Sequence, residues 1–158
     1  MALEKENPVN LRSNRRYAEA LADLIGSLSR EEIEVAVFPG DSAIKLAEEV
    51  IGRVTLQDIY LPRFVKIPHL VNRRMYNGPL EKRVQIIRDL VPEREGVAVV
   101  DDISAYGGKI RGLRESFIAA GIPIRFIILA SQYQIDIPDV TVIRPSDSYL
   151  VHYLRFRY

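Results

Sequence analysis

The sequence predicts one α/β domain built on an open, mostly parallel sheet with helices on both faces. Short apolar runs rich in β-branched residues alternate along the chain with longer segments in which apolar residues recur at helical spacing. The short runs are apolar at nearly every position, as expected for strands that are covered on both faces. A length of 158 residues fits a single domain.

The strands are expected where the apolar runs are shortest and most β-branched. These segments are residues 33–38, 63–67, 97–100, 124–130 and 140–143. The run 124–130 is the most apolar of them, which predicts a central strand. We expect residues 97–100 to end at a pair of carboxylates, Asp101 and Asp102.

Two helices are expected in the first third of the chain. The first covers residues 13–28 and buries Tyr17, Leu21, Leu24, Ile25 and Leu28. The second covers residues 43–51, with Asp41 or Ser42 as its N-cap and Gly52 as its C-terminal stop. The first twelve residues are polar and are expected to form an N-terminal arm ahead of a domain at 13–158.

Two further helices follow in the middle of the chain. Pro79 fits the first turn of one, whose buried face is expected to contain Leu80, Val84, Ile87 and Leu90. The other spans residues 109–120 with Ile110, Leu113 and Phe117 inward, and Gly121 ends it. The tail, residues 144–158, is rich in aromatic side chains that pack against the core, line an interface or contact a ligand.

Composition limits the classes of function. The net charge of +1 gives no reason to expect a nucleic acid or an anionic membrane as a partner. The chain has no cysteine and only two histidines, which argues against disulfides, a thiol nucleophile and a zinc site. We find no apolar segment of signal-peptide or membrane-spanning length and therefore expect a cytoplasmic protein.

The stretch from Gly96 to Ile110 carries the most specific chemistry. Its expected strand ends at Asp101 and Asp102, and a loop with Gly107 and Gly108 leads into a helix near Lys109. Carboxylates accept hydrogen bonds from sugar hydroxyls, and the start of a helix binds phosphate through free N–H groups. This order predicts a nucleotide-sugar site; the alternative is a plain pair of acids at a strand end.

A second strand, glycine turn and helix unit occurs earlier in the chain. The strand ending at Phe38 is followed by Pro39, Gly40, Asp41 and Ser42. This turn is able to bind an anion at the helix start, or it is only a connection with a cap. Both glycine turns leave the carboxyl ends of strands, so they face one site if the two strands are neighbours.

Residues 69–78 are expected to form a loop of unusual length for a compact α/β domain. Arg73 and Arg74 lie in it and would be placed to close over a polyphosphate. The alternative is a solvated loop with two exposed cations.

The segment from Val99 to Lys109 resembles the phosphoribosyl-pyrophosphate signature of type I phosphoribosyltransferases. In that family two apolar residues, an acidic pair, a small-residue loop and a helix follow one another. The order of elements over residues 13–143 is also similar. The resemblance implies a phosphoribosyltransferase-like fold, pentosyl transfer to a base with Mg²⁺, a phosphoribosyl or nucleotide ligand, a C-terminal hood over the base and a homodimer.

The resemblance also implies roles for individual residues. Asp101 and Asp102 would bind the ribose hydroxyls and Mg²⁺, and Arg73 and Arg74 would act in catalysis with them. The 5′-phosphate would lie in the loop formed by Ser104, Ala105, Tyr106, Gly107, Gly108 and Lys109. Pyrophosphate would lie at the turn formed by Pro39, Gly40 and Asp41, with Lys66 among the cations that neutralise it.

Three residues depart from the family pattern and indicate an alternative. Tyr106 and Lys109 replace hydroxyl residues that donate to the 5′-phosphate, and Asp41 adds a negative charge beside the pyrophosphate turn. The alternative is a non-catalytic homologue that senses a nucleotide or serves as an interaction module. A third possibility is an unrelated doubly wound domain for another phosphorylated ligand, which a different strand order would indicate.

Overall fold

The computed structural model describes residues 8–30, 32–55, 57–68, 70, 79–104 and 107–157. Its strands are β1 (Val35–Phe38), β2 (Arg63–Lys66), β3 (Val97–Ser104), β4 (Ile124–Ser131) and β5 (Val140–Arg144). Its helices are α1 (Pro8–Leu28), α2 (Asp41–Val54), α4 (Leu80–Leu90), α5 (Gly108–Ala119) and α6 (Ser148–Arg157). The predicted alternation of strands and helices is confirmed.

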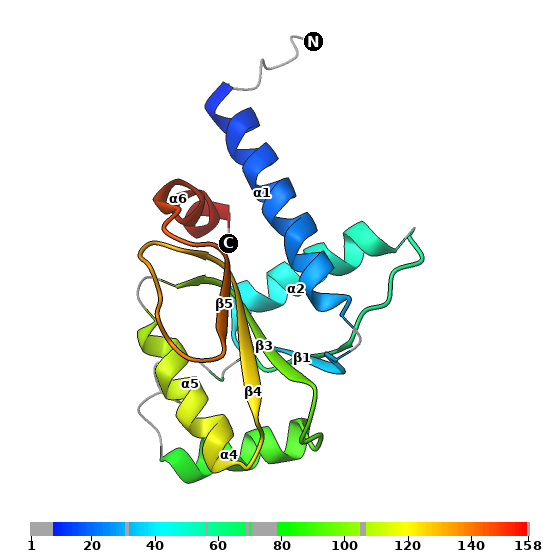
Figure 1. Cartoon of the computed structure of the whole chain (residues 1–158), viewed down its shortest axis with the longest axis vertical. Coiled ribbons are helices and arrows are strands. Elements are labelled where there is room, and N and C mark those ends of the chain that lie inside the picture. Colours follow the sequence, from blue (N-terminus) through cyan, green and yellow to red (C-terminus); the bar gives the residue numbers. More distant parts are fainter. Residues whose placement is uncertain are drawn as a thin grey trace.

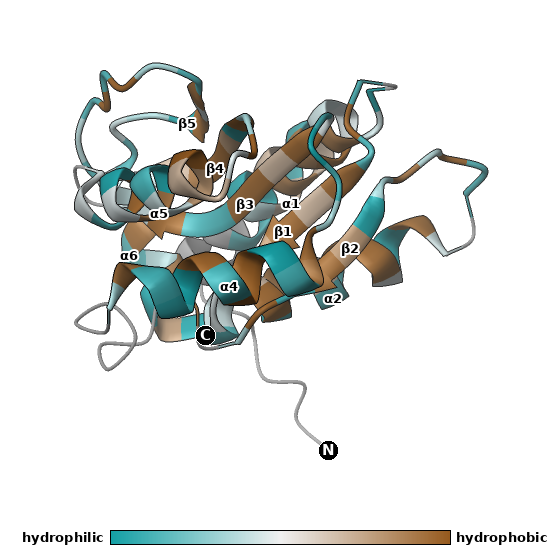
Figure 2. Ribbon diagram, turned by 90° about the horizontal axis from the view of Figure 1, so that it is seen from below, coloured by the Kyte–Doolittle hydropathy of each residue, from teal (hydrophilic) through white to brown (hydrophobic). Residues whose placement is uncertain are grey.

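The described strands form one parallel sheet in the order β2-β1-β3-β4-β5. Helices α1, α2 and α6 pack on one face of this sheet, and α4 and α5 pack on the other (Figure 1). The strands are hydrophobic and the outer faces of the helices are hydrophilic (Figure 2). The predicted fold class, a single α/β domain with an open parallel sheet between helices, is confirmed.

Strand periodicity explains the two-sided core. Successive side chains of a strand point to opposite faces of the sheet, so an apolar run supplies both faces at once. In β3, Ala98 and Val100 belong to the cluster under α1, α2 and α6, whereas Val97 and Val99 belong to the cluster under α4 and α5. The predicted central position of residues 124–130 is also confirmed, since β4 lies between β3 and β5.

Helix boundaries differ from those that the sequence predicted. Helix α1 begins at Pro8 rather than at Ser13, because proline fits the first turn of a helix and no breaker follows it. Helix α2 continues through Gly52 to Val54 and does not stop at the glycine. One glycine weakens a helix without ending it when the preceding turns pack against the sheet.

Gly52 is therefore a position at which alanine should stabilise the protein. The glycine is exposed inside α2, and no atom lies within 4 Å of the place where a Cβ would be added. We expect Gly52→Ala to raise the free energy of unfolding by roughly 1 kcal/mol, because alanine has the higher helix propensity. Urea denaturation of the two proteins measures this difference, and a less stable variant would contradict the helical assignment.

The buried face of α4 is rotated from the predicted one. Leu80 and Leu90 are each 45% exposed, and Arg83 is buried with 6% of its surface exposed. The guanidinium group of Arg83 donates to Ser116 Oγ of α5 at 3.0 Å, so α4 and α5 share a polar contact that helical spacing could not indicate. Val84 and Ile87 are buried as predicted.

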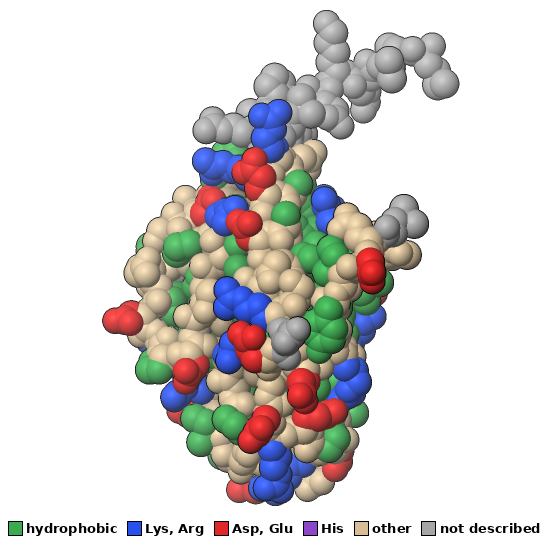
Figure 3. All heavy atoms as spheres, turned by 45° about the vertical axis from the view of Figure 1, so that its right-hand side comes forward, with side chains coloured by type: hydrophobic (Ala, Val, Ile, Leu, Met, Phe, Trp, Pro, Cys, Tyr) green, Lys and Arg blue, Asp and Glu red, His purple; other side chains and the backbone are tan. Residues whose placement is uncertain are grey.

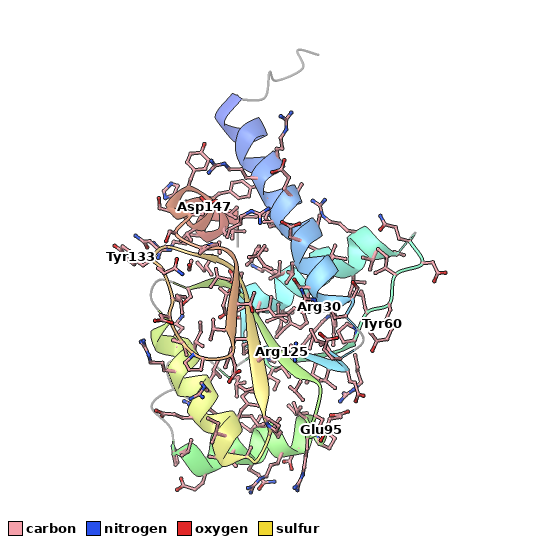
Figure 4. The ribbon with its side chains drawn as sticks, viewed as in Figure 1. Arg30, Tyr60, Glu95, Arg125, Tyr133 and Asp147 are labelled. Atoms are coloured by element: carbon pink, nitrogen blue, oxygen red, sulfur yellow. The ribbon has the colours of Figure 1, made fainter. Side chains whose placement is uncertain are left out.

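The C-terminal segment forms a helix that is packed on the core. Leu150, Val151 and Leu154 of α6 are buried in the cluster of α1 and α2. The guanidinium group of Arg157 lies 4.7 Å from the ring centroid of Tyr17 in α1. Asp147, labelled in Figure 4, precedes α6 and accepts a hydrogen bond from the N–H of Leu150 at 3.0 Å. Packing on the core, one of the alternatives for this tail, is thus observed, and the role of a hood stays a prediction.

Charges of both signs are interspersed on the face shown in Figure 3. This distribution agrees with the net charge of +1. Within the described residues, no helix has both the length and the hydropathy needed to cross a membrane.

Candidate functional site

The sheet reverses its direction of winding between β1 and β3. Strand β2 lies on one side of β1, and the chain then returns to place β3 on the other side. Loops that leave two such strands diverge to opposite faces and open a crevice at their carboxyl ends. Because β1 and β3 are paired neighbours, as predicted, both glycine turns identified in the sequence follow adjacent strands at this switch point, and we call this edge of the sheet the crevice.

The turn after β1 leads directly into α2. Pro39 and Gly40 are buried, and Gly40 has a φ of 125°, a conformation that disfavours any residue with a Cβ. The first helical hydrogen bond runs from the N–H of Ile44 to the carbonyl of Gly40 at 3.0 Å. The N–H groups of residues 41–43 therefore precede the helical ladder, as an anion site requires.

The predicted side-chain cap of α2 is wrong. The N-cap is Gly40, and no side chain caps the helix. Asp41 is exposed in the first turn, where its charge is favourable to the helix dipole. Ser42 instead donates its hydroxyl hydrogen to Asp102 Oδ1 at 3.0 Å. A buried carboxylate without a hydrogen-bond donor costs more free energy than an uncapped helix start, which explains why Ser42 bonds to Asp102.

Strand β3 does not end at the acidic pair. It continues to Ser104, because β4 is long enough to pair with it after β1 has ended. Asp102 is only 3% exposed, and Asp101 is half-buried. The N–H of Asp102 donates to Asp101 Oδ1 at 2.9 Å. The two carboxyl groups thus lie past the end of β1, and as neighbours in a strand they point to opposite faces of the sheet, with Asp102 on the side of α2.

The environment of Asp101 disfavours its charged form. Its pKa is raised well above the ordinary value, first because burial removes water from the carboxylate, and then because of the negative charge of Asp102 and a hydrogen bond with it. The N–H of Asp102 and the positive charge of Lys109 lower the pKa and offset part of this effect. Carboxyl groups whose pKa is raised by burial and a neighbouring charge are common at functional sites, which makes Asp101 a candidate.

The turn after β3 is anchored at both of its described ends. Ser104 is half-buried, and its Oγ accepts a hydrogen bond from the N–H of Gly107 at 3.1 Å. Gly107 has a φ of 91° and is the N-cap of α5. The first helical bond runs from the N–H of Arg111 to the Gly107 carbonyl at 3.1 Å, so the N–H groups of residues 108–110 precede the ladder.

The remaining predicted site residues are placed as follows. Gly108 and Lys109 are exposed at the start of α5. Lys66 is exposed at the end of β2, where it is the register partner of Phe38. Its position is therefore at the same edge of the sheet as the two turns. Ala105, Tyr106, Arg73 and Arg74 lie outside the described residues.

The sequence did not indicate that Ser42 contacts the acidic pair. Its position in a Pro-Gly-Asp-Ser turn is fully explained by capping chemistry, and its partner lies 60 residues away. Only the pairing of β1 with β3 brings the two together.

An open cavity of about 620 Å³ lies elsewhere, between α2 and α6. It is lined by Lys45, Glu48, Glu49 and Arg157. Arg157 and Glu49 form an ion pair at 2.6 Å, and Lys45 is balanced by Glu48 in the same lining, so the cavity offers no net positive charge to a polyphosphate. The crevice between β1 and β3 remains the better candidate, because two helix starts and the acidic pair follow neighbouring strands there.

Comparison with solved structures indicates the same fold. The chain is similar to a hypoxanthine phosphoribosyltransferase from Trypanosoma cruzi in complex with its product IMP, with a TM-score of 0.54 and 8% identity over 83% of this chain and 76% of the other. It is also similar to a hypoxanthine phosphoribosyltransferase from Staphylococcus aureus, with a TM-score of 0.51 and 13% identity over 83% and 73% of the two chains.

Sequence comparison alone does not find this likeness. No protein-family model matches the chain, and no curated protein sequence matches it either. At 8% and 13% identity the structural similarity concerns the path of the backbone and not the individual site residues. The chain therefore has the fold of the phosphoribosyltransferases, in agreement with the resemblance of residues 99–109 to their signature.

Proposed function

We propose that the chain binds phosphoribosyl pyrophosphate or a nucleotide in the crevice between β1 and β3, and transfers the phosphoribosyl group to a base. One observation supports this most strongly: two glycine turns, each leading into a helix start, flank the carboxyl groups of Asp101 and Asp102 at the switch point of the sheet. Such a layout offers two anion sites with acceptors for a sugar between them.

The proposed ligand matches this layout group by group. The N–H groups of residues 108–110 bind the 5′-phosphate, and those of residues 41–43 bind the pyrophosphate. Asp101 and Asp102 accept hydrogen bonds from the ribose hydroxyls. Lys66, at the neighbouring strand end, neutralises part of the negative charge. The loop with Arg73 and Arg74 is proposed to supply further cations.

The proposed reaction is a displacement at the anomeric carbon. The bond from this carbon to the pyrophosphate oxygen breaks with its electron pair leaving on the pyrophosphate, and a nitrogen of the base forms the new bond. Positive charge develops on the sugar and negative charge on the leaving group, so the contribution of the protein is positioning and electrostatic stabilisation. The negative carboxylates of the acidic pair suit the positive charge on the sugar. The positive end of the α2 dipole suits the negative charge on the leaving pyrophosphate.

The residues present fit a magnesium ion. In the described part of the chain, no group of three or more acidic, histidine or cysteine side chains could hold a metal ion. Mg²⁺ often binds through only one or two carboxylates and completes its shell with water and substrate phosphates. Asp101 and Asp102 provide such oxygens. When bound, the ion would neutralise charge on the diphosphate.

The exposed Asp41 favours a second candidate function. It places a negative charge in the first turn of α2, beside the proposed pyrophosphate position. A protein that bound a nucleoside monophosphate without turnover would not need to accommodate a pyrophosphate there. This candidate is a non-catalytic homologue that senses a nucleotide or acts as an interaction module.

Titration calorimetry with phosphoribosyl pyrophosphate and Mg²⁺ tests the proposal. We expect saturable binding that fails when Asp101 and Asp102 are both changed to asparagine, and pyrophosphate release when a base is added. A folded chain that does not bind the compound at millimolar concentration would refute the proposal. Binding of nucleoside monophosphates without any pyrophosphate release would instead favour the sensor.

A further inference from the structure

Ser42 links the two halves of the crevice. It is the second residue of α2, and its hydroxyl donates to Asp102 Oδ1 at 3.0 Å. A serine in the first turn of a helix commonly turns its hydroxyl toward the backbone of its own helix. Here the hydroxyl reaches across to β3, and the helix is left without a side-chain cap. The contact therefore joins the turn after β1 to the acidic pair.

The bond from Ser42 reaches Asp102 from another element of the fold, in addition to the hydrogen bond that Asp102 shares with the neighbouring Asp101. Asp102 is 3% exposed, and a buried carboxylate requires donors. Among the described residues, no lysine, arginine or histidine forms an ion pair with it. Asp102 has the same parity in β3 as Ala98 and Val100, which pack on the α2 side of the sheet. Ser42 is the residue of α2 that meets it there.

The bond from Ser42 fixes the plane of this carboxyl group. A carboxylate has two oxygens, so engaging Oδ1 directs where Oδ2 points. Aspartate rotates freely about its terminal bond when nothing holds it, because that torsion is broad. Recognition of a sugar hydroxyl requires the acceptor to lie within a few tenths of an ångström of the correct place.

We infer that Ser42 is a positioning residue that sets the preference of the site for ribose over 2-deoxyribose. It acts by holding Asp102 in the orientation that accepts a ribose hydroxyl. The inference rests on the proposed function, because it assumes that the crevice binds a phosphoribosyl group. The inference assigns to Ser42, on α2, a part in sugar specificity beyond that of the acidic pair.

The test compares a ribonucleotide with its 2′-deoxy form on the full-length chain. Calorimetric titration of inosine monophosphate and 2′-deoxyinosine monophosphate gives the ratio of their affinities. We expect the wild type to prefer the ribonucleotide by about tenfold, since one hydrogen bond to a charged acceptor is lost in the deoxy form. Ser42→Ala should lower this ratio to roughly twofold or less, because Asp102 is no longer held.

Two substitutions and one control separate positioning from general damage. Ser42→Thr retains the hydroxyl and should retain the ratio, whereas Ser42→Cys keeps the shape with a weak donor and should lower the ratio like Ser42→Ala. The control is Ser29→Ala, since Ser29 donates to the Gly26 carbonyl at the end of α1, away from the crevice. It should leave the ratio unchanged.

The outcomes distinguish this inference from the proposed function. A wild type that binds neither nucleotide overturns the proposed function and the inference with it. A wild type that prefers the ribonucleotide, together with Ser42→Ala and Ser42→Cys proteins that keep the full preference, overturns the inference alone. Loss of the preference in both variants, with retention in Ser42→Thr, supports it.

Discussion

Asp101→Asn is expected to weaken ligand binding and at the same time to stabilise the protein. The carboxylate is proposed to accept ribose hydroxyls, and an amide replaces a charged acceptor by a neutral one. We expect affinity for a ribonucleotide to fall about 10- to 100-fold, the range for one or two charge-assisted hydrogen bonds. Calorimetric titration of wild type and variant measures this change.

The stabilisation follows from the environment of the carboxyl group. Burial, and then the charge of Asp102, raise the pKa of Asp101 in the folded protein, so the folded state holds its proton more tightly than the unfolded state does. A raised carboxyl pKa favours folding below the unfolded value of about 4, and this contribution is lost as the pH rises through the folded pKa. Above the unfolded pKa, the carboxyl group of Asp101 therefore lowers the free energy of unfolding.

Asparagine removes that cost. We expect the variant to be more stable than wild type at pH 7 by about 1 kcal/mol, a typical gain when a destabilising functional group is replaced. The difference should shrink as the pH falls through the raised folded pKa and should vanish below about 4, where the carboxyl group is protonated in the unfolded chain as well. Urea denaturation in metal-free buffer at several pH values measures it.

Asp139→Asn is a matched control for this substitution. Asp139 lies just before β5, away from the crevice, and has a φ of 64° that asparagine tolerates well. It should leave the affinity for a ribonucleotide unchanged. An Asp101→Asn protein that binds as tightly as wild type would exclude a ligand-binding role for this carboxylate. A variant less stable at pH 7 would contradict the assigned cost of its charge.

Gly107→Ala is expected to damage both stability and binding. The residue has a φ of 91°, and an added Cβ would lie 2.6 Å from Ile137 Cδ1 and 3.5 Å from Ile135 Cγ2. The backbone conformation and the close contact together should lower the free energy of unfolding by roughly 1–3 kcal/mol. Chemical denaturation measures this loss.

The effect on binding follows from the position of Gly107 at the start of α5. Its N–H is held by Ser104 Oγ, and its carbonyl begins the helical ladder. A shift of this residue moves the N–H groups of residues 108–110, which are proposed to bind the 5′-phosphate. We expect a loss of nucleotide affinity of about tenfold, measured by calorimetry under conditions in which the variant remains folded.

Gly52→Ala provides the comparison, because it is the same chemical change at an exposed helical position without neighbours. It should leave affinity unchanged and change stability in the opposite direction. If Gly107→Ala were as stable as wild type and bound nucleotide equally well, the left-handed turn would have no role in either property.

The strands were the most predictable part of the fold. The apolar runs at residues 97–100 and 124–130 became β3 and β4, because a parallel sheet covered on both faces needs apolar residues at every position. Boundaries were less predictable. The continuation of β3 past Asp101 depends on the length of β4, and the passage of α2 through Gly52 depends on packing of the preceding turns.

The candidate site was predicted in part. The glycine turns could be placed after strands from local pattern alone, although β3 continues past the acidic pair to Ser104, and the pairing of β1 with β3 then brought both turns to one edge of the sheet. Arg83 shows the limit of such reasoning, since a helical pattern predicts that leucines are buried and cannot foresee a buried arginine bonded to Ser116. Such a contact depends on which helix becomes the neighbour.

The sequence by itself determined the elements that hold the site: apolar strands, turns with Gly40 and Gly107, and two adjacent carboxylates after an apolar run. These features are local, because side-chain periodicity and glycine conformation are properties of a few consecutive residues. Only the tertiary structure decided that Ser42 contacts Asp102 and that burial raises the pKa of Asp101. The first depends on segments 60 residues apart meeting at the switch point of the sheet, and the second on how the folded chain covers Asp101, and no local pattern specifies either.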